Sequence, residues 1–300
     1  PMAIDRAVWI ALKPRSDERV VVHALDLDDA AAFRLDRMVR SGADWSAYLK
    51  GVAWALQGSG VSLKGWEGVL SGDVPQGAGL ASSAAMELAA ARAFAVASDI
   101  PWRPVVMAKL CQRAENEWVG VRCGIMDQMI SAVAEGDHAV LIDCRSREAR
   151  PVPLPAGTVV AVLDTGTRRG LVESAYNERR EACEAAAAFF GVQALRDVGV
   201  EEIREAGPGL EQRLKRRARH VVTENERTLE ACEAMEEGDG GRLGRLMNAS
   251  HLSLRDDFEV SSEELDAVVR CARRHPGCRG ARMTGAGFGG CAIALVRESD

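Results

Sequence analysis

The sequence predicts an α+β protein of two domains. Strand-like and helical segments follow one another in both halves of the chain. A chain of 300 residues with 47% hydrophobic side chains can fill two cores of ordinary size. Between the halves, residues 150–157 carry three prolines and are expected to form an exposed connector rather than a helix. We therefore place the domains at residues 1–155 and 156–300.

The first half opens with two strand-like runs, residues 8–12 and 20–22, joined by a polar turn that is typical of a β-hairpin. Helices are then expected where Ala, Leu, Met and Glu accumulate or apolar residues recur at helical spacing. These helices cover residues 45–57, 82–98, about 105–118 and 125–134, and a strand is expected at 139–142.

The second half repeats the mixture of strands and helices. It begins with an apolar strand at residues 159–163 and continues with helices rich in Arg and Glu. The expected helices cover residues 174–190, 210–238, 242–255 and 262–274. Two strands around a glycine turn follow them, the second at residues 291–296.

Composition excludes several classes of protein. The 44 acidic side chains outnumber the 38 basic ones, and the net charge of −6 argues against general attraction to nucleic acid or anionic membranes. The longest apolar runs are far shorter than the roughly 20 residues that cross a bilayer. The eight cysteines form neither C-x-x-C nor a tight His/Cys cluster, so we expect mostly buried thiols, no disulfide framework, no zinc site and a cytoplasmic location.

A glycine-rich loop leads directly into the helix expected from Ser82. The loop and the first turn of the helix comprise Pro75, Gln76, Gly77, Ala78, Gly79, Leu80, Ala81, Ser82 and Ser83. Glycines let a backbone approach a ligand closely, and the free N–H groups of a helix start suit a phosphate. An ordinary helix start capped by Ser82 or Ser83 explains the pattern about equally well. The loop matches neither a Walker loop nor a Rossmann fingerprint.

Carboxylates lie on two consecutive helical segments that a glycine-containing turn separates. Glu115 and Glu117 belong to the first segment and Asp127 to the second, so two acids could converge. A carboxylate together with a serine hydroxyl suits magnesium, which shares its coordination with phosphates and waters. Exposure on a helix surface explains Glu117 well, but it explains Asp127 less well because Asp127 stands among apolar residues.

A second glycine-dense segment lies between the last two strands. Residues 280–290 contain five glycines, including Gly285 and Gly287, where a bare hairpin needs one or two. This density favours a loop that lets a nucleotide approach closely. Tyr176, early on a charged helix, indicates little by itself.

Together these segments resemble the galactokinase branch of the GHMP small-molecule kinases. The loop at residues 75–84 is similar to the family's second motif, and residues 123–128 are similar to its C-G-I-M-D-Q segment. Residues 171–180 match the pattern L-x-x-S-x-Y-x-x-R-R, and residues 283–291 resemble the third motif. The segments occur in family order, and Phe288 stands where mevalonate kinases usually carry glycine.

The resemblance also implies that parts of the family pattern lie outside the chain. Residues 1–5 resemble the segment that follows the family's first motif, and the family usually continues beyond the strand ending at Val296. The first motif supplies an arginine and several sugar ligands. We therefore expect the 300 residues to be a fragment that is nearly inactive and poorly stable by itself.

The resemblance implies a two-domain GHMP kinase fold, with ATP in the cleft between the domains, that phosphorylates galactose at its anomeric hydroxyl. Asp127 would contact the sugar and act as the base, Ser83 and Glu115 would hold Mg²⁺, and Gly124 and Tyr176 would hold sugar hydroxyls. The residues expected at the nucleotide are Gly77, Ala78, Gly79, Leu80, Ala81, Ser82, Ser83, Gly285 and Gly287.

Two alternatives remain open at the level of the sequence. One is a kinase for another substrate, such as N-acetylgalactosamine, arabinose or a non-sugar alcohol. The other is an inactive sugar-binding regulator. The intact glycine loop and Asp127 argue against the regulator, because loss of either is its usual mark.

Overall fold

The computed structural model describes residues 1–40, 44–168 and 172–299. Its contacts divide the chain into two compact units. The first unit comprises residues 1–76 and 81–151, and the second comprises residues 77–80 together with the chain from residue 152 onward. The glycine-rich loop of the first half therefore packs as part of the second unit.

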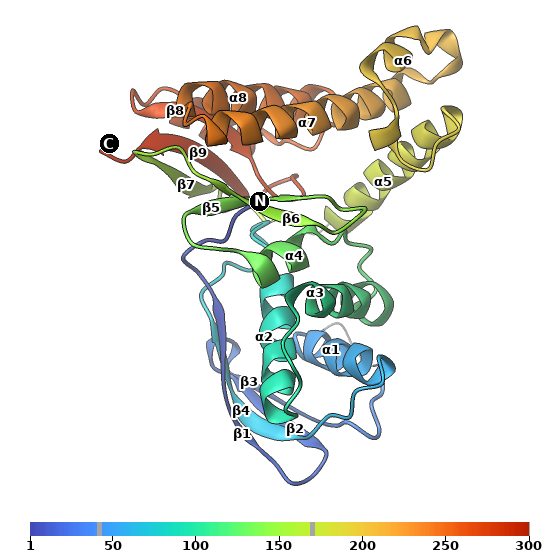
Figure 1. Cartoon of the computed structure of the whole chain (residues 1–300), viewed down its shortest axis with the longest axis vertical. Helices are drawn as coiled ribbons and strands as arrows, with labels where there is room; N and C mark the ends of the chain where they lie inside the picture. Colours follow the sequence, from blue (N-terminus) through green and yellow to red (C-terminus); the bar gives the residue numbers. More distant parts are fainter. Residues whose placement is uncertain (41–43, 169–171, 300) are drawn as a thin grey trace. The chain divides into compact units, whose positions relative to one another are not determined.

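The elements up to residue 153 combine strands and helices (Figure 1). In chain order they are β1 (Val8–Pro14), β2 (Arg19–Ala24), β3 (Asp29–Arg34), α1 (Ser46–Gly58), β4 (Trp66–Gly72), α2 (Ser82–Ala97), α3 (Pro104–Arg113), α4 (Met126–Val133), β5 (His138–Ile142) and β6 (Ala149–Pro153). Within the described residues, β1 to β4 form one sheet in the order β1-β4-β2-β3, and β5 pairs with β6.

The expected hairpin of the first two strands is wrong. Strand β4 lies between them, antiparallel to β1 and parallel to β2, so β1 and β2 are not neighbours. The glycines of residues 65–72 indicate a loop, but in the sheet they allow close approach. A Cβ on Gly68 would lie 2.2 Å from the carbonyl oxygen of Ala11 on the neighbouring strand.

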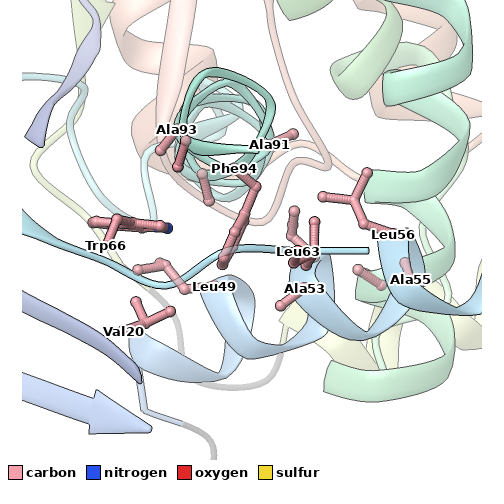
Figure 2. Close-up of a cluster of buried hydrophobic side chains, with 14 of the residues drawn as sticks. Val20, Leu49, Ala53, Ala55, Leu56, Leu63, Trp66, Ala91, Ala93 and Phe94 are labelled. Atoms are coloured by element: carbon pink, nitrogen blue, oxygen red, sulfur yellow. The ribbon is translucent and has the colours of Figure 1, made fainter. Parts of the chain in front are cut away.

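The core of the first unit lies between this sheet and the helices α1 and α2 (Figure 2). Trp66 of β4 and Phe94 of α2 are fully buried, and their rings meet edge to face at 5.7 Å between centroids. Leu49 and Leu56 of α1 are buried in the same cluster. Their burial follows the helical spacing of the apolar residues in α1.

The second unit contains a further sheet and the longer helices. Its elements are β7 (Thr158–Asp164), α5 (Val172–Phe189), α6 (Val200–Glu205), α7 (Gln212–Glu236), α8 (Gly240–Asp256), α9 (Glu263–Ala272), β8 (Cys278–Met283) and β9 (Cys291–Arg297). Among the described residues, β7, β9 and β8 form an antiparallel sheet in that order. Leu265 and Val269 of α9 pack against Met283 in its core.

Most of the expected helices and strands are confirmed to within a few residues. The helix expected to run to residue 118 ends at Arg113 and continues as a π-helical turn, Ala114–Val119. The expected connector at residues 150–157 is partly wrong because it contains β6. Strand β6 tolerates Pro151 and Pro153 because it has only β5 as a neighbour among the described strands. Strands β3 and β4 and helix α6 were not expected from the sequence.

The cysteines are less buried than expected. Cys111, Cys232 and Cys291 are buried, three others are partly buried, and Cys144 and Cys271 are exposed. The expectation of mostly buried thiols, drawn from the absence of metal and disulfide motifs, is therefore wrong for five of the eight cysteines. In the part of the chain that the structure describes, no helix combines the length and the apolar character needed to span a membrane.

Candidate functional site

The glycine-rich loop and the turn between β8 and β9 meet through their backbones within the second unit. Gly79 has a φ of +74° and Gly285 a φ of +72°. Residues other than glycine rarely adopt this left-handed backbone conformation. A Cβ on Gly285 would lie 2.7 Å from the Cα of Gly79, and one on Gly290 would lie 2.6 Å from the carbonyl oxygen of Ala78. Only glycine at these positions allows the two segments to come together.

The meeting of the two segments leaves a small hollow of about 50 Å³. It is lined by Gly77, Gly79, Thr167, Ala286, Gly287, Gly289 and Gly290. A wall made largely of glycine backbone suits a group whose oxygens accept hydrogen bonds from N–H donors, such as a phosphate. The hollow thus brings together expected nucleotide residues from both motifs, while Gly285 packs on Gly79 rather than lining it.

Arg168 places a positive charge beside the glycine-rich loop. Its side chain passes over Gly77, where a Cβ would lie 3.4 Å from the Cδ of Arg168. Its Nη1 and Nη2 donate to the two carboxylate oxygens of Asp164 at 2.8 and 2.6 Å. This hydrogen-bonded ion pair lowers the pKa of Asp164 to about 2. Asp164 therefore stays charged and holds the guanidinium near the loop.

Helix α2 begins immediately after the loop without a side-chain cap. Ala81 occupies the N-cap position in a left-handed conformation with a φ of +58°. Its side chain accepts no hydrogen bond from the first backbone N–H groups of the helix. The sequence-based alternative of a helix start capped by Ser82 or Ser83 is therefore wrong, because both serines lie inside the first turn. The first N–H groups of α2 remain available to an anion.

A buried polar cluster connects three segments of the first unit. Gln128 of α4 donates through Nε2 to Oε2 of Glu115 at 2.6 Å and to Oε2 of Glu87 at 3.1 Å. The thiol of Cys123 donates to the same Oε2 of Glu115 at 3.1 Å. Glu87 and Gln128 are fully buried, and Glu115 is 5% exposed. The cluster holds Glu115, the expected magnesium ligand, in one orientation.

The cluster changes the pKa of two carboxyl groups. Burial, reinforced by the negative charge of Glu115, raises the pKa of Glu87 to about 9, so Glu87 keeps its proton at neutral pH. Burial and the charge of Glu115 also raise the pKa of Asp127, which lies half-buried in the first turn of α4. A raised pKa makes Asp127 a stronger base than an exposed aspartate.

Glu115 is positioned by the π-helical turn Ala114–Val119, a local geometry that is frequent at functional sites. Both side-chain hydrogen bonds of Glu115 go to Oε2, and none reaches Oε1 from the described residues. No cluster of three or more His, Cys, Asp or Glu side chains in the described residues could hold a metal. Magnesium needs no such cluster, because it accepts one or two protein oxygens together with phosphates and waters.

The expected sugar-binding residues are divided between the two units. Gly124 and Asp127 lie close in sequence at the start of α4, and a Cβ on Gly124 would meet open space. Tyr176 lies on α5 in the second unit and is 38% exposed. Leu171, which opens the expected motif around Tyr176, falls outside the described residues.

Sequence reasoning missed four residues of these sites: Glu87, Gln128, Thr167 and Arg168. Glu87 carried a usable signal, because it is the one acid in the otherwise apolar, alanine-rich stretch of α2. Gln128 directly follows Asp127, but its partners are separated from it by 13 and 41 residues. Thr167 and Arg168 stand in no glycine-rich run, and nothing local indicates their place beside the hollow.

Comparisons with known proteins identify the family and relatives to which the chain is similar. The family model of the GHMP kinase N-terminal domain matches residues 47–135, and that of the GHMP kinase C-terminal domain matches residues 231–300. The galactokinase of Roseiflexus sp. (strain RS-1) is 47% identical over 304 residues, which cover 100% of this chain and 78% of that protein. The galactokinase of Chloroflexus aurantiacus (strain ATCC 29366 / DSM 635 / J-10-fl) is 46% identical over an alignment that covers 99% of this chain and 77% of that protein.

Solved structures show the same relationship. The crystal structure of Lactococcus lactis galactokinase complexed with galactose has a TM-score of 0.94 and 35% sequence identity, covering 99% of this chain and 79% of that one. A mevalonate kinase structure has a TM-score of 0.66 at 20% identity, which is a likeness of fold alone. The expected GHMP kinase fold with mixed helices and strands is confirmed.

We predict that Gly285→Ala destabilises the protein much more than Gly238→Ala. Both glycines have a φ of +72°, but a Cβ on Gly238 meets nothing within 4 Å, whereas one on Gly285 clashes with Gly79. The shared backbone strain costs about 1 kcal/mol, and the clash should bring the total at Gly285 to about 2–4 kcal/mol in urea unfolding. Equal losses for the two variants would contradict the close approach.

We predict that Glu87→Gln flattens the dependence of stability on pH. Between its ordinary pKa of 4.5 and its raised value of about 9, the unfolded carboxyl is ionised while the folded one keeps its proton. The folded state therefore binds more protons, and stability falls as pH rises, by up to about 1.4 kcal/mol per pH unit. Denaturant unfolding from pH 5 to 9 tests this, with exposed Glu117→Gln as the control; parallel curves for wild type and Glu87→Gln would refute it.

Proposed function

The chain belongs to the galactokinase family of the GHMP kinases, and from this we propose that it transfers the γ-phosphoryl group of ATP to the anomeric hydroxyl of galactose. The products are galactose 1-phosphate and ADP. The observation that carries the proposal is the half-buried Asp127, whose raised pKa suits a base and which lies beside the oriented Glu115.

Asp127 is the proposed catalytic base. Its carboxylate accepts the proton of the anomeric hydroxyl, or orients that hydroxyl for attack on the γ-phosphorus. Burial and the nearby charge of Glu115 support this role because they raise the affinity of Asp127 for a proton. Gly124 lies just before α4 with open space at its Cα, which supports contact with a sugar hydroxyl there. Tyr176 is proposed to contact a second hydroxyl.

The glycine-rich loop and the start of α2 are the proposed phosphate site. The uncapped N–H groups of α2 and the glycine-lined hollow support this assignment, since phosphoryl transfer depends on positioning and on neutralising phosphate charge. Arg168, held by Asp164 over Gly77, adds a positive charge next to the loop. It supplies charge of the kind that stabilises a transferring phosphoryl group.

Ser83 and Glu115 are the proposed protein ligands of Mg²⁺. The open Oε1 of Glu115 and the hydroxyl of Ser83 in the first turn of α2 are hard oxygen donors of the kind that this ion accepts. When bound, the ion neutralises phosphate charge and orients the phosphates. A cytoplasmic location, expected from the cysteine content, belongs to the same proposal.

We predict that the full gene product forms ADP from Mg·ATP in the presence of galactose and that the second product is a sugar 1-phosphate. A coupled ADP-release assay with phosphorus NMR of the product tests this. N-acetylgalactosamine and arabinose serve as competing substrates, and kcat/KM should be highest for galactose. A higher value for either of the other sugars would reassign the substrate, and sugar binding without turnover would indicate a regulator instead.

We predict that Asp127→Asn lowers kcat by at least about 10²-fold while the affinity for nucleotide stays within about twofold, because the amide cannot accept the proton. Asp137→Asn is the matched control, since Asp137 is exposed in the same unit. Single-turnover kinetics and nucleotide titration separate the two quantities. A near-normal kcat in Asp127→Asn would show that Asp127 is not the catalytic base.

We predict that Glu115→Ala raises the concentration of Mg²⁺ needed for half-maximal rate by about tenfold or more, while galactose affinity changes little, because one hard oxygen ligand is lost. Glu117→Ala is the control: Glu117 lies two residues away, is exposed and pairs with Arg113 at 3.0 Å. Titrations of Mg²⁺ at fixed ATP measure the effect. Equal losses of affinity for Mg·ATP and for galactose would contradict the assignment.

A further inference from the structure

The second unit contains a larger cavity between α6 and α7, which pack against each other (Figure 1). Its volume is about 410 Å³, within the range of small-molecule sites. It is lined by Val200, Ile203, Arg204, Gln212, Lys215, Arg216, Arg219 and Thr223. It shares no lining residue with the glycine-lined hollow, and none of the roles assigned above involves it.

The two helices contribute different side chains to the cavity. Helix α6 contributes the apolar side chains of Val200 and Ile203 together with Arg204, which pairs with Glu201. Helix α7 contributes cationic side chains at positions 215, 216 and 219, which helical spacing places along one side of the helix. None of the described residues that line the cavity is acidic, although the whole chain carries a net charge of −6.

Carboxylates near the cavity balance only part of its positive charge. Arg219 pairs with Asp257, and Arg216 forms an ion pair with Glu259 at 2.8 Å between nitrogen and oxygen. Glu259 is shared, because the buried Arg217 also binds it. Arg216 and Arg217 thus pair with different oxygens of one carboxylate, so two positive charges face a single negative charge.

Two cationic groups of the lining retain unused hydrogen-bonding capacity. The ammonium group of Lys215 has no carboxylate partner among the described residues and donates only to the carbonyl oxygen of Arg204 at 3.2 Å. The Nε of Arg216 is buried and has no hydrogen-bond partner among them. This buried Nε is closed off from the cavity, whereas the ammonium group of Lys215 can donate to an anionic oxygen there.

We propose that this cavity binds a small organic phosphate. The phosphoryl group binds Lys215, Arg216 and Arg219, whose N–H donors match its oxygens, and the organic part lies against the half-buried Val200. Inorganic phosphate satisfies the cations but leaves the side chain of Val200 partly exposed, so an ester with an apolar body binds more tightly. The proposal is independent of the phosphoryl-transfer site.

Isothermal titration calorimetry of the full chain with phenyl phosphate, inorganic phosphate and phenol tests the proposal. With ATP present at a concentration that occupies the proposed phosphoryl-transfer site, we expect phenyl phosphate to bind in 1:1 stoichiometry and at least about threefold more tightly than inorganic phosphate, and phenol not to bind. Absence of phenyl phosphate binding overturns the proposal. Equal affinity for phosphate and its phenyl ester overturns the part concerning an organic ligand.

Three variants locate the site. Lys215→Gln should lower phenyl phosphate affinity at least about tenfold, and it leaves no carboxylate unpaired. Gln212→Glu adds an acid at the first position of α7, where it favours the helix but repels the ligand, so a loss of at least about threefold cannot be ascribed to misfolding. Arg213→Gln is the control on the same helix, because Arg213 pairs with Glu178 and does not line the cavity. Unchanged affinity in the first two variants, or an equal loss in Arg213→Gln, places binding elsewhere and overturns the proposal.

Discussion

The contact between two glycine-containing backbones is the constraint on which the proposed phosphate site depends. Residues 77–80 lie so close to the turn between β8 and β9 that a Cβ on Gly285 or Gly290 would overlap the backbone of Gly79 or Ala78. The same contact forms the hollow, and Arg168, held by Asp164, lies over Gly77 beside it. A backbone held by steric exclusion provides N–H groups in defined directions, and that is the requirement for holding a phosphate.

The buried cluster of Glu87, Glu115 and Gln128 is held by side-chain hydrogen bonds rather than by close backbone packing. Gln128 donates to both Glu87 and Glu115, and burial together with the charge of Glu115 raises the pKa of Glu87, so that Glu87 keeps its proton at neutral pH. Gln128 can donate to both because an amide nitrogen carries two N–H groups. The cluster therefore directs Oε2 of Glu115 inward without requiring a second buried charge, which would be costly.

The sequence predicted those features that depend on local patterns. The glycine-rich loop, the helix after it and Asp127 among apolar neighbours are signals within a dozen residues, and their similarity to a known family assigned roles to them. The order of the strands could not be predicted, because Gly65, Gly68 and Gly72 indicate a loop when read locally yet allow β4 to enter the sheet. The partnership of Gln128 with Glu87 likewise depends on how α2 and α4 pack.

The assignment of residues 77–80 to the second unit has a consequence for the order in which the protein is made. The loop is synthesised about 200 residues before Gly285 and Gly290, the residues against which it packs. At about 5–20 residues per second, the ribosome reaches them roughly 10–40 s later. During this interval the first unit can fold while residues 77–80 lack their packing partners, so the proposed phosphate site is completed only after β8 and β9 emerge.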